Sequence, residues 1–273
     1  MYGLDKPRFH QYNKFHAINL IKEELDYDDF YDSDIIIYAT GAGIQSNIHD
    51  SNDSIYLLNT IVPIKICNGL KKIAYKGVFV TFGSYFEIGE TSKQKPYTEI
   101  DVQTSTAFPP NEYTLSKRML TRFVSSYKHS YTHWHFILPT IYGETENPTR
   151  LIPYTINAIQ TNQEAHFTFG NQTRQYIYIE EIPYVLNLAY KKSLPNGIYN
   201  IQGAEIMTVK DIVNYIYNAF GKEVPSNCFG TNERIDTSME YLALDGTKLK
   251  KEIGFIPSIK LSKEIIKKYT LQL

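Results

Sequence analysis

The chain has 273 residues and a formal net charge of -1, with 28 lysines and arginines against 29 aspartates and glutamates. This length fits one large α/β domain, alone or with a smaller appendage. The balanced charge excludes a protein that binds nucleic acid through bulk positive charge, so we expect no nucleic acid among its partners.

The sequence also argues against a membrane protein and a disulfide-stabilised protein. No apolar run reaches the ~18 residues that a membrane-spanning helix needs. The first residues, Met1–Arg8, lack the apolar core of a signal peptide. The two cysteines, Cys67 and Cys228, are far apart and suit neither a disulfide framework nor a zinc site. We therefore expect a cytoplasmic protein with reduced thiols and no metal.

The first 33 residues are polar and aromatic, and they end in an acidic stretch. We expect a short strand at Ala17–Leu20 and a short helix or turn over the acidic residues. The next segment, Asp34–Tyr38, carries a run of β-favouring side chains followed by small residues. This pattern is typical of a buried parallel strand that ends in a loop.

That loop contains Gly41-x-Gly43, which resembles the start of a dinucleotide fingerprint. However, Ser46 stands where the third glycine belongs, and the polar residues 47–54 open no clear helix. We therefore expect the end of this strand to lie alongside a cofactor rather than to cradle its pyrophosphate.

The next helix and strand each present one polar residue with two interpretations. Ile55–Leu70 has helical apolar spacing, interrupted by Pro63, and contains Asn59. Asn59 is either solvent-exposed or bonded to backbone groups near a site. Gly77–Ser84 predicts a strand, and its last residue is a hydroxyl at the carboxyl end, where active sites of α/β sheets gather. Ser84 is therefore either catalytic or a serine that satisfies a loop backbone.

Tyr113 and Lys117 lie four residues apart at the start of a segment with helical apolar spacing. Residues i and i+4 share one face of a helix, so a phenol is placed beside an ammonium. A nearby positive charge favours the phenolate and should lower the pKa of the tyrosine, which could then exchange a proton with a carbonyl oxygen. The spacing alone is weak in a chain with 23 tyrosines, and a solvated helix face is the alternative.

The segments on either side of this helix complete an alternating pattern. Residues 90–110 are polar and end in two prolines, so they predict a surface loop. His133–Leu138 predicts a strand, on which His133 and His135 share one side; a metal pair there lacks a third ligand nearby. The order strand, helix, strand, helix, strand indicates a doubly wound parallel sheet.

The second half of the chain mixes short strands with helices and predicts a smaller lobe that holds a substrate. We place the domains at residues 1–143 and 144–273, with some segments of the second returning to the first sheet. The expected strands are Phe167–Phe169, Arg174–Glu180 and Gly197–Ile201, and the expected helices are Leu151–Ile159, Glu181–Tyr190, one N-capped by Thr208, and Ser262–Tyr269.

Taken together, these segments resemble the extended short-chain dehydrogenase/reductase family, in its nucleotide-sugar epimerase/dehydratase/reductase branch. The order and spacing of the motifs carry the resemblance, which is closest in style to the reductases of 4-keto-6-deoxy nucleotide sugars, such as the abequose and paratose synthases. The matching segments are Asp34–Gly41, Asn59, Ser84–Gly89, Tyr113-x-x-x-Lys117, Ile141–Gly143, Arg174–Ile179, Ala243–Asp245 and Leu249–Phe255.

The resemblance implies a fold and a set of residue roles. The fold is α/β: a Rossmann-like doubly wound parallel sheet, N-terminally shortened, with a smaller mixed α/β substrate lobe. Tyr113 would be the general acid/base, Lys117 would lower its pKa and contact the nicotinamide ribose of NAD or NADP, and Ser84 would bond the substrate oxygen. The cofactor would lie against Ala39, Thr40, Gly41, Asn59, Tyr113, Lys117 and Pro139, and the substrate would contact Ser84, Thr140, Arg174, Arg234 and the Arg150–Pro153 stretch.

The sequence departs from the family pattern before Asp34. The family opens with a strand, a Gly-rich loop and a helix that cradle the cofactor pyrophosphate, and we find no such unit in the first 33 residues. Gln175 also replaces the aspartate that usually follows the arginine of this motif. These departures put cofactor binding in question.

Three functional hypotheses follow. The first is an NAD(P)-dependent enzyme that reduces or epimerises C4 of a nucleoside-diphosphate 4-keto-6-deoxyhexose in polysaccharide or O-antigen synthesis, possibly as a homodimer. The second is a non-catalytic homologue, deficient in the cofactor site, that binds nucleotide sugars or a partner chain. The third is a sensor that binds NAD(P) without turnover.

Overall fold

The computed structural model describes residues 1–4, 14–44, 49–128, 130–232 and 238–271. Its centre is a parallel four-stranded sheet in the order β3-β4-β5-β8. Each β4 residue from Val78 to Ser84 pairs with the β5 residue from Thr132 to Leu138, so the carboxyl ends of both strands lie at the same edge. The strands are β3 (Ile35–Tyr38), β4 (Val78–Ser84), β5 (Thr132–Leu138) and β8 (Gly197–Asn200).

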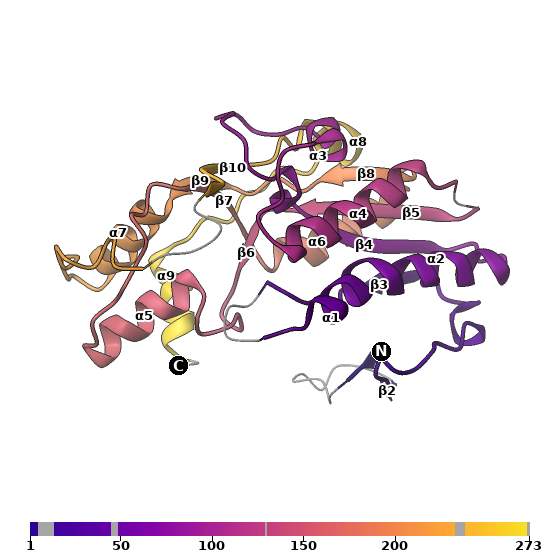
Figure 1. Ribbon diagram of the computed structural model, residues 1–273, viewed down its shortest axis with the longest axis horizontal. Helices are drawn as coiled ribbons and strands as arrows, with labels where there is room; N and C mark the ends of the chain where they lie inside the picture. Colours follow the sequence, from indigo (N-terminus) through magenta and orange to yellow (C-terminus); the bar gives the residue numbers. More distant parts are fainter. Residues whose placement is uncertain (5–13, 45–48, 129, 233–237, 272–273) are drawn as a thin grey trace.

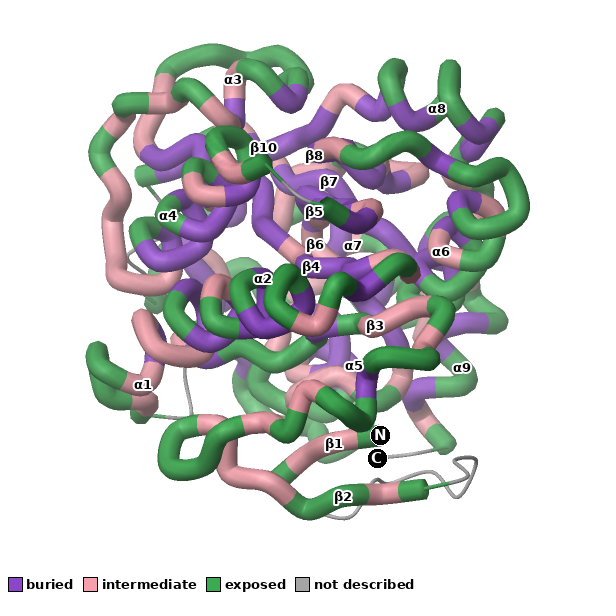
Figure 2. Tube along the Cα trace, turned by 90° about the vertical axis from the view of Figure 1, so that its right-hand side faces the viewer, coloured by how far each residue is buried: buried purple, intermediate pink, exposed green. Residues whose placement is uncertain are grey.

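Helices cover both faces of this sheet, as Figure 2 shows in end view. Successive residues of β4 point to opposite faces. Phe79 packs in one cluster with Ile66 of α2, whereas Val80 packs in another with Val185 of α6. The first face carries α1 (Asn52–Tyr56), the π-helical turn η2 (Leu57–Ile61), α2 (Val62–Lys72) and α4 (Glu112–Ser126), and the second carries α6 (Glu181–Lys191) and α8 (Thr247–Ile253). The fold is thus a Rossmann-like doubly wound sheet.

A second, smaller lobe adjoins the carboxyl edge of the sheet (Figure 1). Its strands pair in the order β10-β7-β6, and β9 pairs antiparallel with β7. Ile156, Ile212 and Ile266, one from each of three helices, meet in one buried core. The elements of this lobe are β6 (Thr140–Tyr142), β7 (Thr173–Tyr178), β9 (Glu205–Thr208), β10 (Tyr241–Leu242), α5 (Leu151–Thr161), α7 (Val209–Ala219) and α9 (Lys263–Thr270).

The remaining elements differ most from the expectations. Of the short strand expected at Ala17–Leu20, only Ala17 lies in a strand, β2 (His16–Ala17), which pairs with β1 (Tyr2–Gly3). The acidic stretch that follows contains the 3-10 turn η1 (Asp28–Phe30). The segment expected to be a loop contains α3 (Glu99–Thr104). Thr98 caps α3 and exchanges hydrogen bonds with Asp101, a capping box that the sequence already contained. No helix among the described residues is long and apolar enough to cross a membrane.

Candidate active site

Ser84 lies where β4 ends, and the backbone geometry explains its position. The strand continues into the 3-10 turn η3 (Tyr85–Ile88), and the Ser84 hydroxyl accepts a hydrogen bond from the Phe86 amide at 3.3 Å. The Ser84 amide in turn donates to the Glu87 carboxylate at 2.7 Å. Ser84 therefore does satisfy a loop backbone, and the same contacts fix its hydroxyl at the carboxyl edge of the sheet.

Tyr113 lies in the first turn of α4, which Asn111 caps by accepting the Thr114 amide at 2.9 Å. Its ring stands edge-on to Phe86, with the ring centroids 6.3 Å apart. Burial raises the pKa of Tyr113 to about 12, although the nearby Ser84 hydroxyl and Arg150 guanidinium lower it. The fold thus brings the Ser84 and Tyr113 hydroxyls together and keeps the phenol protonated.

Lys117 is buried one turn further along α4. Its ammonium lies 6.0 Å from the centroid of the Tyr113 ring and donates to the Phe82 carbonyl at 3.0 Å. Burial lowers the pKa of Lys117 to about 8, while the negative charge of Glu87 raises it. The expected lowering of the Tyr113 pKa by Lys117 is not found, because burial of the phenol dominates and the ammonium turns toward a strand carbonyl.

Asn59 is fully buried within η2 and joins three segments. Its side chain accepts the Ala42 amide at 3.0 Å and donates to the Ala42 carbonyl at 2.9 Å and the Ser116 hydroxyl at 3.0 Å. Pro63 has no amide hydrogen to give the Asn59 carbonyl, which accounts for a π-helical turn at this point of the helix. Of the two interpretations of Asn59, the structure shows the one bonded to backbone groups.

The loop after β3 passes directly over this polar cluster. A Cβ atom on Gly41 would lie 3.1 Å from the Asn59 amide oxygen and 3.7 Å from the Lys117 ammonium, so the glycine lets the backbone pass in close contact with the Asn59 amide. The Gly43 amide, however, donates to the Asp50 carboxylate at 2.7 Å, and Gly43 has a φ of 87°. An amide held by a carboxylate does not face a phosphate, so the Gly41-x-Gly43 loop flanks the site rather than forming a phosphate cradle.

The cluster fits the nicotinamide-ribose half of a dinucleotide. The buried Lys117 ammonium has three N–H groups, and its one hydrogen bond found among the described residues goes to Phe82. A ribose hydroxyl beside Gly41 could accept another hydrogen bond from this ammonium. Ala39, Thr40 and Pro139, which we also expected near the cofactor, follow β3 and β5 at this same carboxyl edge. Among the described residues we find no second Gly-rich turn that could hold the pyrophosphate.

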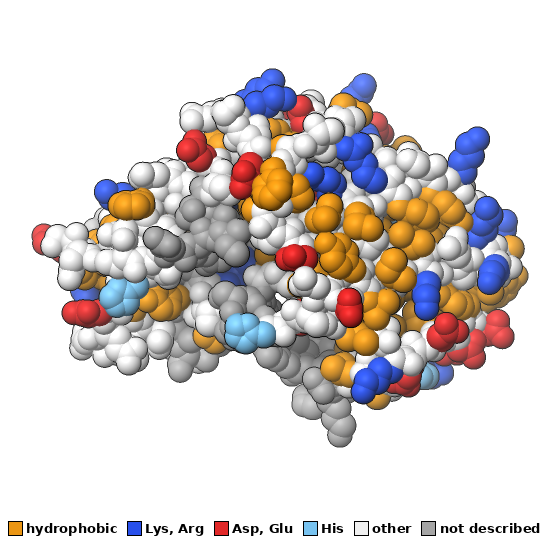
Figure 3. Space-filling model, viewed as in Figure 1, with side chains coloured by type: hydrophobic (Ala, Val, Ile, Leu, Met, Phe, Trp, Pro, Cys, Tyr) orange, Lys and Arg blue, Asp and Glu red, His pale blue; other side chains and the backbone are white. Residues whose placement is uncertain are grey.

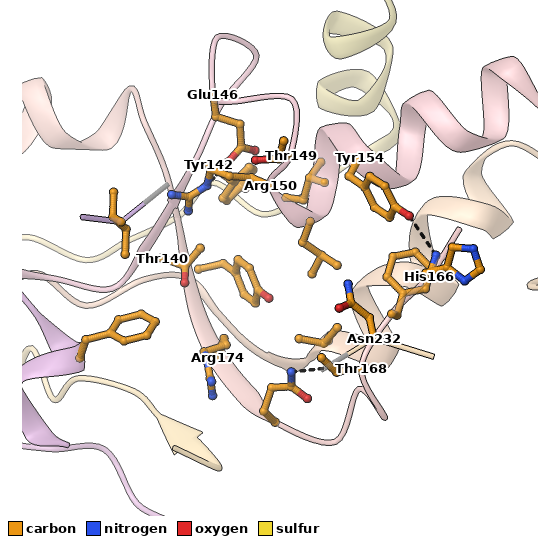
Figure 4. A pocket seen from close by; sticks show the side chains of 18 residues that line it. Thr140, Tyr142, Glu146, Thr149, Arg150, Tyr154, His166, Thr168, Arg174 and Asn232 are labelled. Carbon is orange, nitrogen blue, oxygen red and sulfur yellow. Dashed lines mark hydrogen bonds and ion pairs between the residues drawn. The ribbon is translucent and has the colours of Figure 1, made fainter. Parts of the chain in front are cut away.

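A cavity of about 480 Å³ opens beside this cluster, between the sheet and the smaller lobe. Phe86 and Thr140 line the end nearest to Tyr113. Figure 4 shows Thr140, Arg150 and Arg174 on one side of the cavity and Tyr154, His166 and Asn232 on the other. The cavity therefore has one side with two arginines and the Glu146 carboxylate, and another with aromatic and amide groups.

The two arginines are held in different ways. Arg174 is buried on β7, donates to the Met239 carbonyl at 2.7 Å and lies 6.0 Å from the Phe86 ring centroid. Arg150 forms an ion pair of 2.7 Å with Glu146, whose other oxygen accepts the Tyr269 hydroxyl at 2.6 Å. Arg234, the other arginine expected at the substrate, lies outside the described residues.

Residues 5–201 match the model of the NAD dependent epimerase/dehydratase family. The chain belongs to this family. Its relatives include a dTDP-D-glucose 4,6-dehydratase from Dictyostelium discoideum, 27% identical over 225 residues that cover 75% of this chain and 50% of that protein. A CDP-abequose synthase from Yersinia pseudotuberculosis is 26% identical over 215 residues, which cover 73% of this chain and 70% of that protein.

The fold agrees with solved structures of nucleotide-sugar enzymes. UDP-glucose 4-epimerase from Thermotoga maritima, solved with UDP-glucose, superposes with a TM-score of 0.78 at 16% identity, covering 94% of this chain and 83% of that one. The enzyme WbmG from Bordetella bronchiseptica, solved with NAD and UDP, gives a TM-score of 0.72 at 15% identity, covering 90% and 73%. The chain spans about half the length of the first curated relatives that it matches.

Several residues that line the cavity could not be assigned a role from the sequence. Glu146, Tyr154 and His166 line the cavity, but they come from loops and a helix whose approach depends on the packing of the second lobe. Glu87 was detectable, because Ser84-x-x-Glu87 is a capping-box pattern directly after an apolar strand.

Proposed function

We propose that the protein reduces the C4 carbonyl of a nucleoside-diphosphate 4-keto-6-deoxyhexose, with NAD(P)H as the hydride donor. The observation that carries the proposal is the proximity of Ser84, Tyr113 and Lys117 at the carboxyl edge of the sheet. They lie beside a cavity that two arginines line. The membership in an NAD-dependent family and the relatedness to CDP-abequose synthases support it. We expect the reaction to serve polysaccharide or O-antigen synthesis in the cytoplasm.

The side chains suit the chemistry of a ketone that becomes an alcohol. NAD(P)H, when bound, supplies the hydride, because no side chain can do so. Ser84 donates a hydrogen bond to the carbonyl oxygen, which gains negative charge as the C4–H bond forms. Tyr113, kept protonated by its burial, gives that oxygen its proton. Lys117 holds a positive charge close to the same oxygen and is placed to bind a ribose hydroxyl.

The cavity suits a sugar nucleotide. Arginine binds phosphate oxygens through a planar fork of N–H groups, so we assign the diphosphate to Arg174, with Arg234 as a further candidate, and the sugar to the end lined by Thr140. Tyr154 and Phe167, whose ring centroids lie 5.7 Å apart, present an aromatic wall for the base. Epimerisation at C4 would use the same residues and is the alternative reaction within this proposal.

The residues beside Ser84 favour reduction over removal of water from the sugar. Dehydration requires a base to take a proton from carbon and an acid to protonate the leaving hydroxyl. The residues that follow Ser84 are Tyr85 and Phe86, and the carboxylate that lines the cavity, Glu146, is paired with Arg150. Among the residues that the structure describes, this arrangement offers no acid–base pair of carboxylates at the sugar end.

Replacing Tyr113 with Phe tests the proposal. The variant keeps the ring against Phe86 but loses the proton donor, so kcat should fall by a factor on the order of 10² to 10⁴. Turnover is followed as loss of NAD(P)H absorbance with a 4-keto-6-deoxy nucleotide sugar.

The matched control is Tyr127→Phe, at the C-terminal end of α4, where the hydroxyl contacts Asn68 at the surface. Its turnover should equal that of the parent. Activity of Tyr113→Phe within a few-fold of the parent would show that Tyr113 has no catalytic role.

A nucleotide-sugar-binding protein without turnover is the second candidate. The observation that favours it is the Gly43 amide, which faces Asp50 rather than a phosphate. Calorimetric titration distinguishes the two: this candidate predicts binding of a nucleotide sugar and no binding of NAD(P)H. Micromolar binding of NAD(P)H would refute it.

A further inference from the structure

A fully buried carboxylate stands directly behind the proposed catalytic residues. Glu87 lies in η3 with no exposed surface, and one of its oxygens accepts the Ser84 amide at 2.7 Å. Its other oxygen makes no hydrogen bond of ordinary length among the described residues, although the Thr121 hydroxyl faces the carboxylate. An unsatisfied, ionisable oxygen in the interior is costly, and the proposed mechanism does not use it.

Positive charges face this carboxylate from α4. Lys117 and Arg118 both favour its charged form, and the Thr121 hydroxyl does so as well. Arg118 donates to the Glu87 backbone carbonyl at 2.7 Å and to the Ala107 carbonyl at 2.7 Å, so its guanidinium is fixed in place. Burial outweighs these groups and raises the pKa of Glu87 to about 7.

A chain of buried hydroxyls and imidazoles extends from Thr121 into the sheet. The Thr121 hydroxyl lies 2.8 Å from Nε2 of His135, and Nδ1 of His135 lies 2.7 Å from the Thr81 hydroxyl. Thr81 also lies 2.8 Å from Nε2 of His133. All four residues are buried, and burial lowers the pKa of His135 to about 3. His135 is therefore neutral and carries one ring proton.

The hydrogen bonds of this chain can be satisfied in only two directions. A hydroxyl has one proton, and a neutral imidazole has one N–H and one acceptor nitrogen. When Thr121 donates to an ionised Glu87, His135 must donate from Nε2, and Thr81 must donate to its Nδ1. When Glu87 is protonated or replaced by a donor, each bond reverses and His135 carries its proton on Nδ1.

Gly83 confirms how tightly these groups converge. A Cβ atom at this position would lie 2.5 Å from the Glu87 carboxylate and 2.8 Å from Nε2 of His135. Any side chain there would displace both groups. The carboxylate and the imidazole therefore share one small buried space behind Ser84.

We propose that Glu87 is a positioning residue for the Ser84–Tyr113–Lys117 site: its carboxylate holds the Ser84 backbone, and its negative charge keeps Lys117 protonated. The threonine–histidine chain stabilises that charge by directing its donors toward it. The inference rests on the proposed function for its catalytic consequence, but the link between Glu87 and the tautomer of His135 depends on the buried hydrogen-bond chain and not on turnover. Ionised Glu87 raises the pKa of both Lys117 and Tyr113, which agrees with this role.

The variant Glu87→Gln keeps the shape of the side chain and removes its charge. We expect the alkaline limb of the pH profile of kcat to move down by at least about one pH unit, because the charge that holds Lys117 protonated is gone. KM for the nucleotide sugar should stay within about twofold, since Glu87 does not line the cavity. The control is Glu99→Gln, which removes another buried carboxylate, bonded to the Asn200 amide, and should leave the profile unmoved.

The tautomer of His135 is read by ¹⁵N NMR of histidine-labelled protein above pH 8. The parent should carry the ring proton on Nε2, and Glu87→Gln should carry it on Nδ1, because the amide of Gln donates to Thr121. If Glu87→Gln does not fold, Thr121→Val is the second variant, because it removes the hydroxyl between Glu87 and His135 while Glu87 remains. In Thr121→Val, the ring proton of His135 should stay on the same nitrogen below and above pH 7.

The two readouts separate failure of the inference from failure of the proposed function. A parent protein without turnover contradicts the proposed function, whereas the tautomer still reports on Glu87. An unchanged His135 tautomer in Glu87→Gln, or an unmoved alkaline limb in an active variant, would overturn the inference.

Discussion

At the scale of single residues, burial determines the direction in which the pKa values of the ionisable groups shift. The sequence placed a phenol and an ammonium on one helix face, and the fold then buries the ammonium and half-buries the phenol. As a result, burial raises the pKa of Tyr113 to about 12 and lowers the pKa of Lys117 to about 8. A protonated tyrosine suits the proposed reduction, which must deliver a proton to a developing alkoxide.

Glu87 makes the stability of the protein depend on pH. Its pKa rises from 4.5 to about 7 on folding, so the folded state holds the proton more tightly. This stabilisation is complete below pH 4.5 and is lost as the pH rises through about 7, by roughly 3 kcal/mol in total. Urea unfolding of the parent and of Glu87→Gln measures it as the difference between their free energies of unfolding.

The parent should therefore lose stability relative to Glu87→Gln as the pH rises from 4.5 to about 7. Lys117 acts in the opposite sense at higher pH, because burial lowers its pKa from 10.5 to about 8, so stability is regained above pH 8. A pH-independent difference between the parent and Glu87→Gln would contradict the assignment of a titrating carboxyl in the interior.

The helical segment of α1, η2 and α2 organises the site at the element scale. Asn59 connects the loop after β3 to α4 through its bonds to Ala42 and Ser116, and Thr60 adds a bond to the Ser116 carbonyl at 2.7 Å. The loop, the π-helical turn and α4 are therefore held together by the buried Asn59 amide and the Thr60 hydroxyl.

Replacing Asn59 with Ala should lower the free energy of unfolding by roughly 2–4 kcal/mol, because the Ala42 amide and carbonyl lose their partner in the interior. Chemical denaturation measures the loss. Asn68→Ala on the exposed side of α2 is the control and should cost less than about 0.5 kcal/mol. A loss as small for Asn59→Ala as for the control would show that the amide does not organise the site.

The elements that the sequence predicted and those it did not differ in their physical basis. The strands ending at Tyr38, Ser84 and Leu138 were predictable, because continuous apolar runs bounded by turns carry the signal of buried parallel strands. The helix α3 was not, because its six residues are mostly polar and only the Thr98 and Asp101 pair marks its start. The Glu87 network was invisible as a unit, because its members come from β4, η3, α4 and β5 and meet only after the sheet forms.

An exposed apolar surface is the main feature at the scale of the whole molecule. Ile61, Leu115 and Met119 are all exposed on η2 and α4. Figure 3 shows hydrophobic side chains gathered on the face where these helices lie in Figure 1. Contiguous exposed apolar side chains indicate an interaction surface, and we propose that two copies of the chain pair through it.

The double variant Leu115→Glu with Met119→Glu tests this pairing. Sedimentation should show a dimer for the parent and a monomer for the variant, because two buried carboxylates in each subunit would face each other across a two-fold interface. Ile256→Glu, at another exposed apolar residue, is the control and should remain dimeric. A monomeric parent at micromolar concentration would contradict the proposal.

The transfer of a labelled hydride tests the central claim most directly. The protein is incubated with a nucleoside-diphosphate 4-keto-6-deoxyhexose and NAD(P)H deuterated at the reactive carbon, and the product is analysed by mass spectrometry and NMR. We predict one deuterium at C4 with the parent and at least about 100-fold less labelled product with Tyr113→Phe in the same time. A parent that leaves the ketone unlabelled and unreduced, while binding both cofactor and sugar nucleotide, would contradict the account.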